Sequence, residues 1–167
     1  MHSPALLPED PLFNAARRGD VAALREALAA GVPIDTPNSK GFSALVLASY
    51  DNHLEATRFL LDQGANPNHR DASGSSALMG VSFKGYPAIA RLLIERGADL
   101  NLQNGSGSTA LMFATMFGRH DLMQLLLDAG ADKDIKDARG LTALHLAGQK
   151  GNDTALALLG GAPAQAQ

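Results

Sequence analysis

The sequence predicts an all-α solenoid built by stacking one repeated unit of 33 residues. The first observation is a series of leucines at that spacing: Leu12, Leu45, Leu78, Leu111 and Leu144. The second is a pair of glycine series with the same period: Gly41, Gly74, Gly107, Gly140 and Gly31, Gly64, Gly97, Gly130. The third is composition, because a chain with 5% aromatic residues and no tryptophan suits many small layers of Ala and Leu.

Bulk properties exclude several classes of protein. The 167 residues suffice for one ordinary domain, and the unbroken period leaves no room for a second one. The absence of cysteine excludes a disulfide framework and a thiolate metal site or nucleophile. A net charge of −3 is not typical of a nucleic-acid binder. Only residues 5–7 are apolar before Pro8, and no stretch has the length of a membrane span, so we expect a cytoplasmic location.

The chain begins with a Pro-rich segment, residues 1–11, which we expect to be an extended lead-in. The first helix pair then begins at Leu12, with Gly19 between its two helices. The equivalents of Gly19 in later repeats are Asn52, Gly85, Gly118 and Gly151. Helices favour Gly, and next Asn, where the chain leaves in the left-handed region, so this series predicts a helix end in every repeat.

The second helices carry apolar triplets at residues 59–61, 92–94 and 125–127, which we expect to face neighbouring repeats. Each triplet is followed by a glycine that ends the helix: Gly64, Gly97 or Gly130. Pro87 fits the first turn of such a helix, where its missing N–H costs little.

The stretch Asp137–Ala147 predicts a tight polar turn that runs directly into a helix. The second helix of this last repeat is shorter, about residues 153–159, and is ended by Gly160 and Gly161. We expect it to shield its own leucines poorly: Leu156, Leu158 and Leu159. Residues 161–167 have nothing to bury, which predicts a disordered tail.

These residues resemble the ankyrin repeat family, whose pattern is roughly D-x-x-G-x-T-P-L-H-x-A followed by Gly, L-L and G-A-D-x-N. The match is fullest at Asp137, Gly140, Thr142, Leu144, His145 and Ala147, with Ala143 in the usual place of Pro. The resemblance covers residues 12–159 and implies five stacked helix pairs in an L-shaped, gently curved array with projecting β-hairpin-like turns. The implied repeats are 12–37, 38–70, 71–103, 104–136 and 137–160, as in free-standing bacterial ankyrin proteins.

Candidate catalytic groups are few. In the family, the equivalent of His145 bonds the turn backbone and a neighbouring hydroxyl, here that of Thr142. His53, His69 and His120 occupy different repeat positions and give no shared metal geometry. No Ser-His-Asp set or carboxylate pair has an evident way to converge. We therefore expect no enzyme activity, no cofactor and no metal site.

The resemblance implies a concave binding face formed by the turn tips and one side of the first helices. Large apolar groups occupy it in three successive repeats, and eight of the fourteen Lys and Arg lie on it against one acid, Asp51. Chance, with partial burial of ring edges, is the alternative explanation. The candidate partner-binding residues are Arg17, Arg18, Lys40, Phe42, Tyr50, Arg70, Phe83, Lys84, Met116, Phe117, Lys136, Arg139, Leu141, Gln149 and Lys150.

An aromatic centre with a basic rim predicts a protein–protein interaction module, monomeric and without a catalytic step, whose partner presents an acidic surface. A second interpretation is nucleic-acid binding through the same face, with bases stacked on Tyr50 and Phe83. A third is a structural protein that associates with itself through its C-terminal end.

Overall fold

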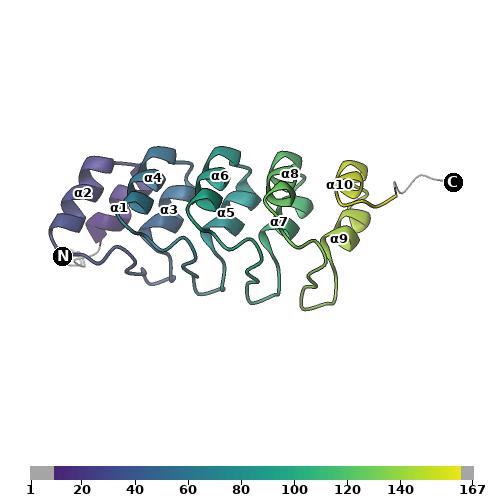
Figure 1. Ribbon diagram of the computed structural model, residues 1–167. Coiled ribbons are helices and arrows are strands. Elements are labelled where there is room, and N and C mark those ends of the chain that lie inside the picture. Colours follow the sequence, from purple (N-terminus) through teal and green to yellow (C-terminus); the bar gives the residue numbers. More distant parts are fainter. Residues whose placement is uncertain (1–9, 163–167) are drawn as a thin grey trace, which may run out of the picture.

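The computed structural model describes residues 10–162 and forms ten helices over that range, arranged as five pairs in one row (Figure 1). No strand occurs within these residues, so the predicted all-α solenoid is confirmed. The helices are α1 Asp10–Arg18, α2 Val21–Ala29, α3 Ala44–Tyr50, α4 Leu54–Asp62, α5 Ala77–Lys84, α6 Pro87–Glu95, α7 Ala110–Met116, α8 His120–Asp128, α9 Ala143–Gln149 and α10 Asp153–Leu158.

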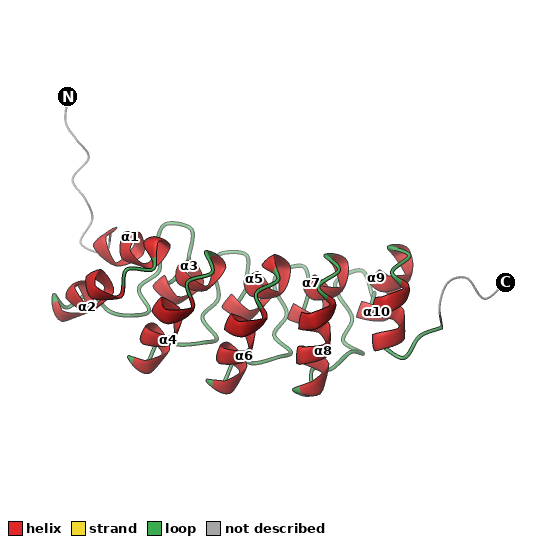
Figure 2. Ribbon diagram, turned by 90° about the horizontal axis from the view of Figure 1, so that it is seen from above, coloured by secondary structure: helices red, strands yellow, loops and turns green. Residues whose placement is uncertain are grey.

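The molecule has three layers. Figure 2 separates the odd-numbered helices from the even-numbered ones, and Figure 1 places the odd-numbered row between the even-numbered row and the loops that project below it. The projecting loops connect each pair to the next and carry the predicted turns. No helix in the described range is both long enough and apolar enough to cross a membrane.

The break between the two helices of each pair has the predicted left-handed backbone. Gly19 has φ 67° and Asn52 has φ 64°, and three further glycines follow them at the same repeat position: Gly85, Gly118 and Gly151. Asn52 is the single non-glycine residue with positive φ in the described chain. Asn tolerates this region better than other side chains except Gly. The prediction that Asn52 ends a helix where the other repeats carry Gly is therefore confirmed.

Each odd-numbered helix from α3 onward begins at a hydroxyl cap. The side chains of Ser43, Ser76, Thr109 and Thr142 accept a hydrogen bond from the backbone N–H three residues later. Such a cap satisfies one of the N–H groups that a helix start leaves without a partner. Among the even-numbered helices, α6 begins at Pro87, as predicted.

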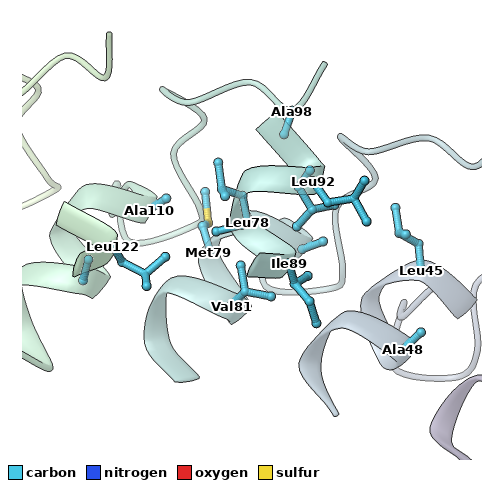
Figure 3. Close-up of a cluster of buried hydrophobic side chains, with 14 of the residues drawn as sticks. Leu45, Ala48, Leu78, Met79, Val81, Ile89, Leu92, Ala98, Ala110 and Leu122 are labelled. Carbon is cyan, nitrogen blue, oxygen red and sulfur yellow. The ribbon is translucent and has the colours of Figure 1, made fainter. Parts of the chain in front are cut away.

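The core is a continuous stack of leucine and alanine layers. Leu12, Leu45, Leu78 and Leu111 are buried, and alanines such as Ala48 and Ala110 fill the narrow space between successive helices. Figure 3 shows one such layer, in which Leu78 and Val81 of α5 and Ile89 of α6 lie between Ala48 and Ala110. The small side chains allow close stacking, so no large aromatic core is needed.

The start of the chain differs from the prediction. We expected an extended segment through residue 11, but α1 already begins at Asp10 and includes Pro11. Proline in the first helical turn removes an N–H that has no helical partner there, so it does not break the helix. The rest of the predicted lead-in, with Pro4 and Pro8, lies outside the described residues.

The C-terminal end also differs. Leu156 and Leu159, expected to be poorly shielded, are buried, and Leu158 is half-buried. The end of α10 has the same backbone closure as the other even-numbered helices, with the Gly161 N–H donating to the Leu156 carbonyl at 2.7 Å. The exposed leucine is Leu144, at 38%, since no following helix pair covers it. The predicted tail is thus held at Gly161, and residues 163–167 lie outside the described range.

Candidate functional site

Four projecting turns are each closed by one side chain at the same repeat position. In the first of them, Asn38 Oδ1 accepts hydrogen bonds from the N–H groups of Lys40 and Phe42, at 2.9 and 3.0 Å. This Asx geometry recurs at Asp71, Asn104 and Asp137. Because the side chain fixes each turn locally, all four turns project in the same form.

Backbone hydrogen bonds join neighbouring turns into one wall. The N–H groups of Ala72, Gly105 and Ala138 donate across to the carbonyls of Lys40, Ser73 and Ser106, at 3.3, 2.8 and 3.0 Å. Side chains extend the same connection, since Gln103 Nε2 donates to the Lys136 carbonyl of the next turn at 2.9 Å. The wall therefore holds its side chains at a fixed spacing from the odd-numbered helices.

Asp137 closes the last turn as a buried carboxylate, with 8% of its surface exposed. Its Oδ1 accepts from the N–H of Leu141 at 3.0 Å and of Arg139 at 2.9 Å. Its Oδ2 accepts from Arg139 Nη2 at 2.8 Å. The Leu141 hydrogen bond lowers the pKa of Asp137 most; burial opposes that shift, and the Arg139 contacts add to it.

Three aromatic rings form a row along the ends of α3, α5 and α7. The Tyr50 and Phe83 rings are parallel, with centroids 6.4 Å apart, and Phe117 meets Phe83 edge-on at 4.6 Å. Lys84 Nζ lies 5.0 Å from the centre of the Tyr50 ring. Tyr50 and Phe117 are 41% and 46% exposed, and none of the three rings belongs to the core packing.

A cavity of about 320 Å³ lies beside this row, between the second and third repeats. We call it the Gly80 cavity, because Gly80 lies in its wall at a position where neighbouring repeats carry Leu47 and Phe113. The other lining residues come from α3, from α5 and from the turns: Phe42, Val46, Tyr50, Asp51, Asp71, Ser75, Ser76, Met79 and Phe83.

Sequence reasoning identified only part of this site. The candidates Phe42, Tyr50 and Phe83 line the cavity, but Val46, Met79, Gly80 and Phe113 were not identified. A glycine in the middle of α5, where it weakens a helix, was the available signal. We call the cavity together with the ring row of Tyr50, Phe83 and Phe117 the aromatic groove.

Three apolar candidates pack against the core instead of standing free: Phe42, Met116 and Leu141. Met116 was expected to continue the series of Tyr50 and Phe83, since it occupies the same repeat position. In the structure Phe117 provides the third ring, and Met116 does not line the cavity.

The basic candidates are spread along the face. Lys84 is the one that contacts the ring row, and Arg139 binds the carboxylate of its own turn. The Arg18 guanidinium lies 3.9 Å from the Asp20 carboxylate, and Arg70 Nη2 donates to the Gln103 carbonyl at 3.0 Å. The remaining candidates are exposed and form no ion pair within the described part of the chain: Arg17, Lys40, Lys136, Gln149 and Lys150.

The acids of this face were undercounted. We expected Asp51 alone, but Asp71 also lines the cavity. Asp71 Oδ1 closes its own turn by accepting from the N–H groups of Ser73 and Ser75. Asp71 Oδ2 has no hydrogen-bond partner among the described residues. The centre of the face therefore carries two carboxylates, Asp51 and Asp71, that form no ion pair with any residue of the range 10–162.

The histidines of the described range have structural contacts. The Thr142 N–H donates to His145 Nδ1 at 3.0 Å, and the Thr142 hydroxyl lies 3.0 Å from the same nitrogen, which confirms the two contacts expected of His145. The Thr142 hydroxyl also accepts from the His145 backbone N–H at 3.4 Å. His53 Nε2 lies 2.7 Å from the Arg17 carbonyl, and His69 Nε2 lies 2.8 Å from the Gly41 carbonyl. Residues 10–162 contain no group of three or more His, Asp or Glu side chains positioned to hold a metal ion.

Comparison with known proteins gives one family. The family model described as "Ankyrin repeats (3 copies)" matches residues 3–71 and 77–167. Among curated proteins, the chain is 43% identical over 65 residues to ankyrin repeat domain-containing protein 29 of Danio rerio. It is 37% identical over 62 residues to inactive serine/threonine-protein kinase TEX14 of Mus musculus.

These two alignments are partial on both sides. They cover 36% and 37% of this chain, and 22% and 4% of the respective relatives. The chain thus aligns with less than a quarter of the length of either relative, and the similarity concerns the repeats.

Proposed function

Because the chain belongs to the ankyrin repeat family, whose members are in general non-enzymatic interaction modules, we propose that it binds a protein partner through the aromatic groove. The observation that carries this proposal is the row of Tyr50, Phe83 and Phe117, which are large rings held outside the core. Aromatic side chains grouped on a surface are typical binding anchors. The proposal includes no catalytic step and no cofactor.

The mechanism is rigid presentation. Asx turns, inter-turn backbone bonds and the stacked helices fix the groove before any partner arrives. Binding therefore costs little ordering entropy, and most of the interaction energy of the anchors contributes to affinity.

Charge supports an acidic partner surface. Basic side chains are exposed at both ends of the face, with Arg17 and Arg18 at one end and Lys136 and Lys150 at the other. Exposed charges of this kind steer association and set orientation more than they add affinity. We therefore expect association to slow as salt rises, because screening shortens the range of the attraction.

Two alternatives keep some support. A Tyr50 ring beside the Lys84 cation also suits a stacked base, and binding to heparin or single-stranded DNA at low salt would indicate that class. The exposed Leu144 favours self-association through the C-terminal end. We propose a monomer, for which light scattering over a dilution series gives a constant mass near 17.4 kDa, whereas a mass that rises with concentration indicates association.

The experiment is affinity capture from the native cell, with the full chain and three variants as bait. Phe83→Ala removes an anchor, Lys84→Glu reverses a groove charge, and Arg91→Glu reverses an exposed charge on α6, outside the groove. We expect the same partner with wild type and Arg91→Glu, and its loss with Phe83→Ala. Capture that is unaffected by Phe83→Ala contradicts the proposal. Cell fractionation tests the cytoplasmic location, which is part of the proposal.

A further inference from the structure

The Gly80 cavity exists because one side chain is missing from a repeated position. At this position the second, fourth and fifth repeats carry large side chains, namely Leu47, Phe113 and Leu146, whereas the third repeat carries Gly80. A Cβ at Gly80 would lie 3.2 Å from Tyr50 Cδ2, so even an alanine would press on the ring. The opening is therefore specific to this pair of repeats.

The walls of the cavity suit a group with an apolar body and a positive charge. Four aromatic residues line it: Phe42, Tyr50, Phe83 and Phe113. Aromatic faces attract cations and also pack against aliphatic stems. Lys84 Nζ, 5.0 Å from the Tyr50 ring centre, shows that a cation is accommodated beside this ring in the free protein.

The carboxylates identify the kind of cation. Asp71 and Asp137 occupy the same turn position, and in the last turn Asp137 Oδ2 accepts from two nitrogens of Arg139, at 2.8 and 3.2 Å. In the third repeat the residue equivalent to Arg139 is Ser73, so Asp71 Oδ2 lacks this guanidinium. Asp51, at the end of α3, lines the same cavity and has no ion pair among the residues that the structure describes.

We propose that the Gly80 cavity binds an arginine side chain of the protein partner, with its stem against the rings and its guanidinium on Asp71. Arginine fits better than lysine because a planar guanidinium stacks on rings and bonds carboxylates through two nitrogens at once. This inference rests on the proposed function and adds a charge pattern to it. The partner presents one arginine to the acidic centre of the face and acidic residues to its basic ends.

The test is selection from a random peptide library displayed on phage, panned on the full-length chain. Peptides that bind wild type should share an arginine flanked by acidic residues. Replacing that arginine by citrulline, its neutral isostere, should weaken binding at least about tenfold, and replacing it by lysine should weaken it less. Selected peptides that carry a bulky apolar residue and no arginine, or that tolerate citrulline, overturn the inference.

Two variants locate the binding. Gly80→Leu fills the cavity and should abolish binding of the arginine peptide. Asp71→Asn keeps the turn, since Asn fills that position at Asn38 and Asn104, and should weaken the same peptide about tenfold even if Gly80→Leu fails to fold. The matched control Asp137→Asn makes the same change in a turn outside the cavity and should leave affinity unchanged. If Asp71→Asn and Asp137→Asn change the affinity for the peptide equally, the inference is overturned. The proposed function is tested separately: it fails if Phe83→Ala does not change capture of the native partner.

Discussion

At the scale of the residue, side chains close to the backbone explain most of the local structure. His145 is the clearest case, because its ring accepts the Thr142 N–H and completes a capping box at the start of α9. Replacing His145 by Ala should lower the free energy of unfolding by ~1 kcal/mol, the usual net value of one hydrogen bond.

Chemical denaturation measures that change, and the affinity of the folded variant for the partner should stay the same. A His145→Ala variant that is as stable as wild type but no longer binds would show that His145 contacts the partner and does not stabilise the fold.

Asp137 makes stability depend on pH on the acid side. Its pKa lies below the ordinary 3.8 in the folded chain, chiefly because of the Leu141 hydrogen bond. A depressed pKa contributes stability that is complete above pH 3.8 and is lost as pH falls through the lower folded value. We therefore expect wild type to exceed Asp137→Asn in stability at neutral pH, and the difference to shrink below pH 3.8. Urea unfolding of both proteins between pH 2 and pH 7 checks this. A stability difference that grows toward low pH would contradict a lowered pKa for Asp137.

At the scale of the element, the helix ends depend on backbone conformation at one position per repeat. Gly118 tests this without steric complication, since it has φ 65° and a Cβ there would meet nothing within 4 Å. Gly118→Ala should cost ~1–2 kcal/mol from the left-handed backbone alone. Gly118→Asn should cost less, because Asn52 already occupies the equivalent place. Thermal unfolding ranks the variants, and an alanine variant as stable as wild type would show that the backbone relaxes.

Sequence reasoning succeeded for these elements because their signals are local and repeated. Gly or Asn marks the helix break in all five repeats, and the Asn or Asp that closes a turn acts within about four residues in the four repeats that have one. The same logic fails for the Gly80 cavity, which depends on side chains from three repeats and on an absent one. It named both Met116 and Phe117 but expected Met116 to continue the series of Tyr50 and Phe83, whereas Met116 packs against the core and Phe117 supplies the third ring.

At the scale of the whole molecule, stability should be uneven along the solenoid. The middle repeats have two neighbours, while α9 and α10 have one, and Leu144 is exposed where its equivalents are buried. In a nearest-neighbour array such an end opens first. Hydrogen exchange should therefore show residues 141–159 opening before residues 76–127. Uniform protection would mean that the buried Leu156 and Leu159 hold the last repeat as firmly as two neighbours hold a middle one.

The central claim is that the ring row binds a partner and is not part of the core. Phe83 decides between these roles, because it contacts Tyr50 and Phe117 but is absent from the core packing. Truncating a binding anchor typically costs ~2 kcal/mol or more of affinity, whereas truncating a core Phe costs ~3–5 kcal/mol of stability.

The most direct measurement is therefore the Kd for the captured partner and the Tm of Phe83→Ala, measured on the same preparation beside Lys84→Glu and Arg91→Glu. Phe83→Ala should weaken binding at least about tenfold, a loss of ~1.4 kcal/mol, while its Tm stays close to that of wild type. Lys84→Glu should mainly slow association, with a smaller effect at high salt, and Arg91→Glu should change neither quantity. A Phe83→Ala variant that melts early yet binds normally would place Phe83 in the core and the partner elsewhere.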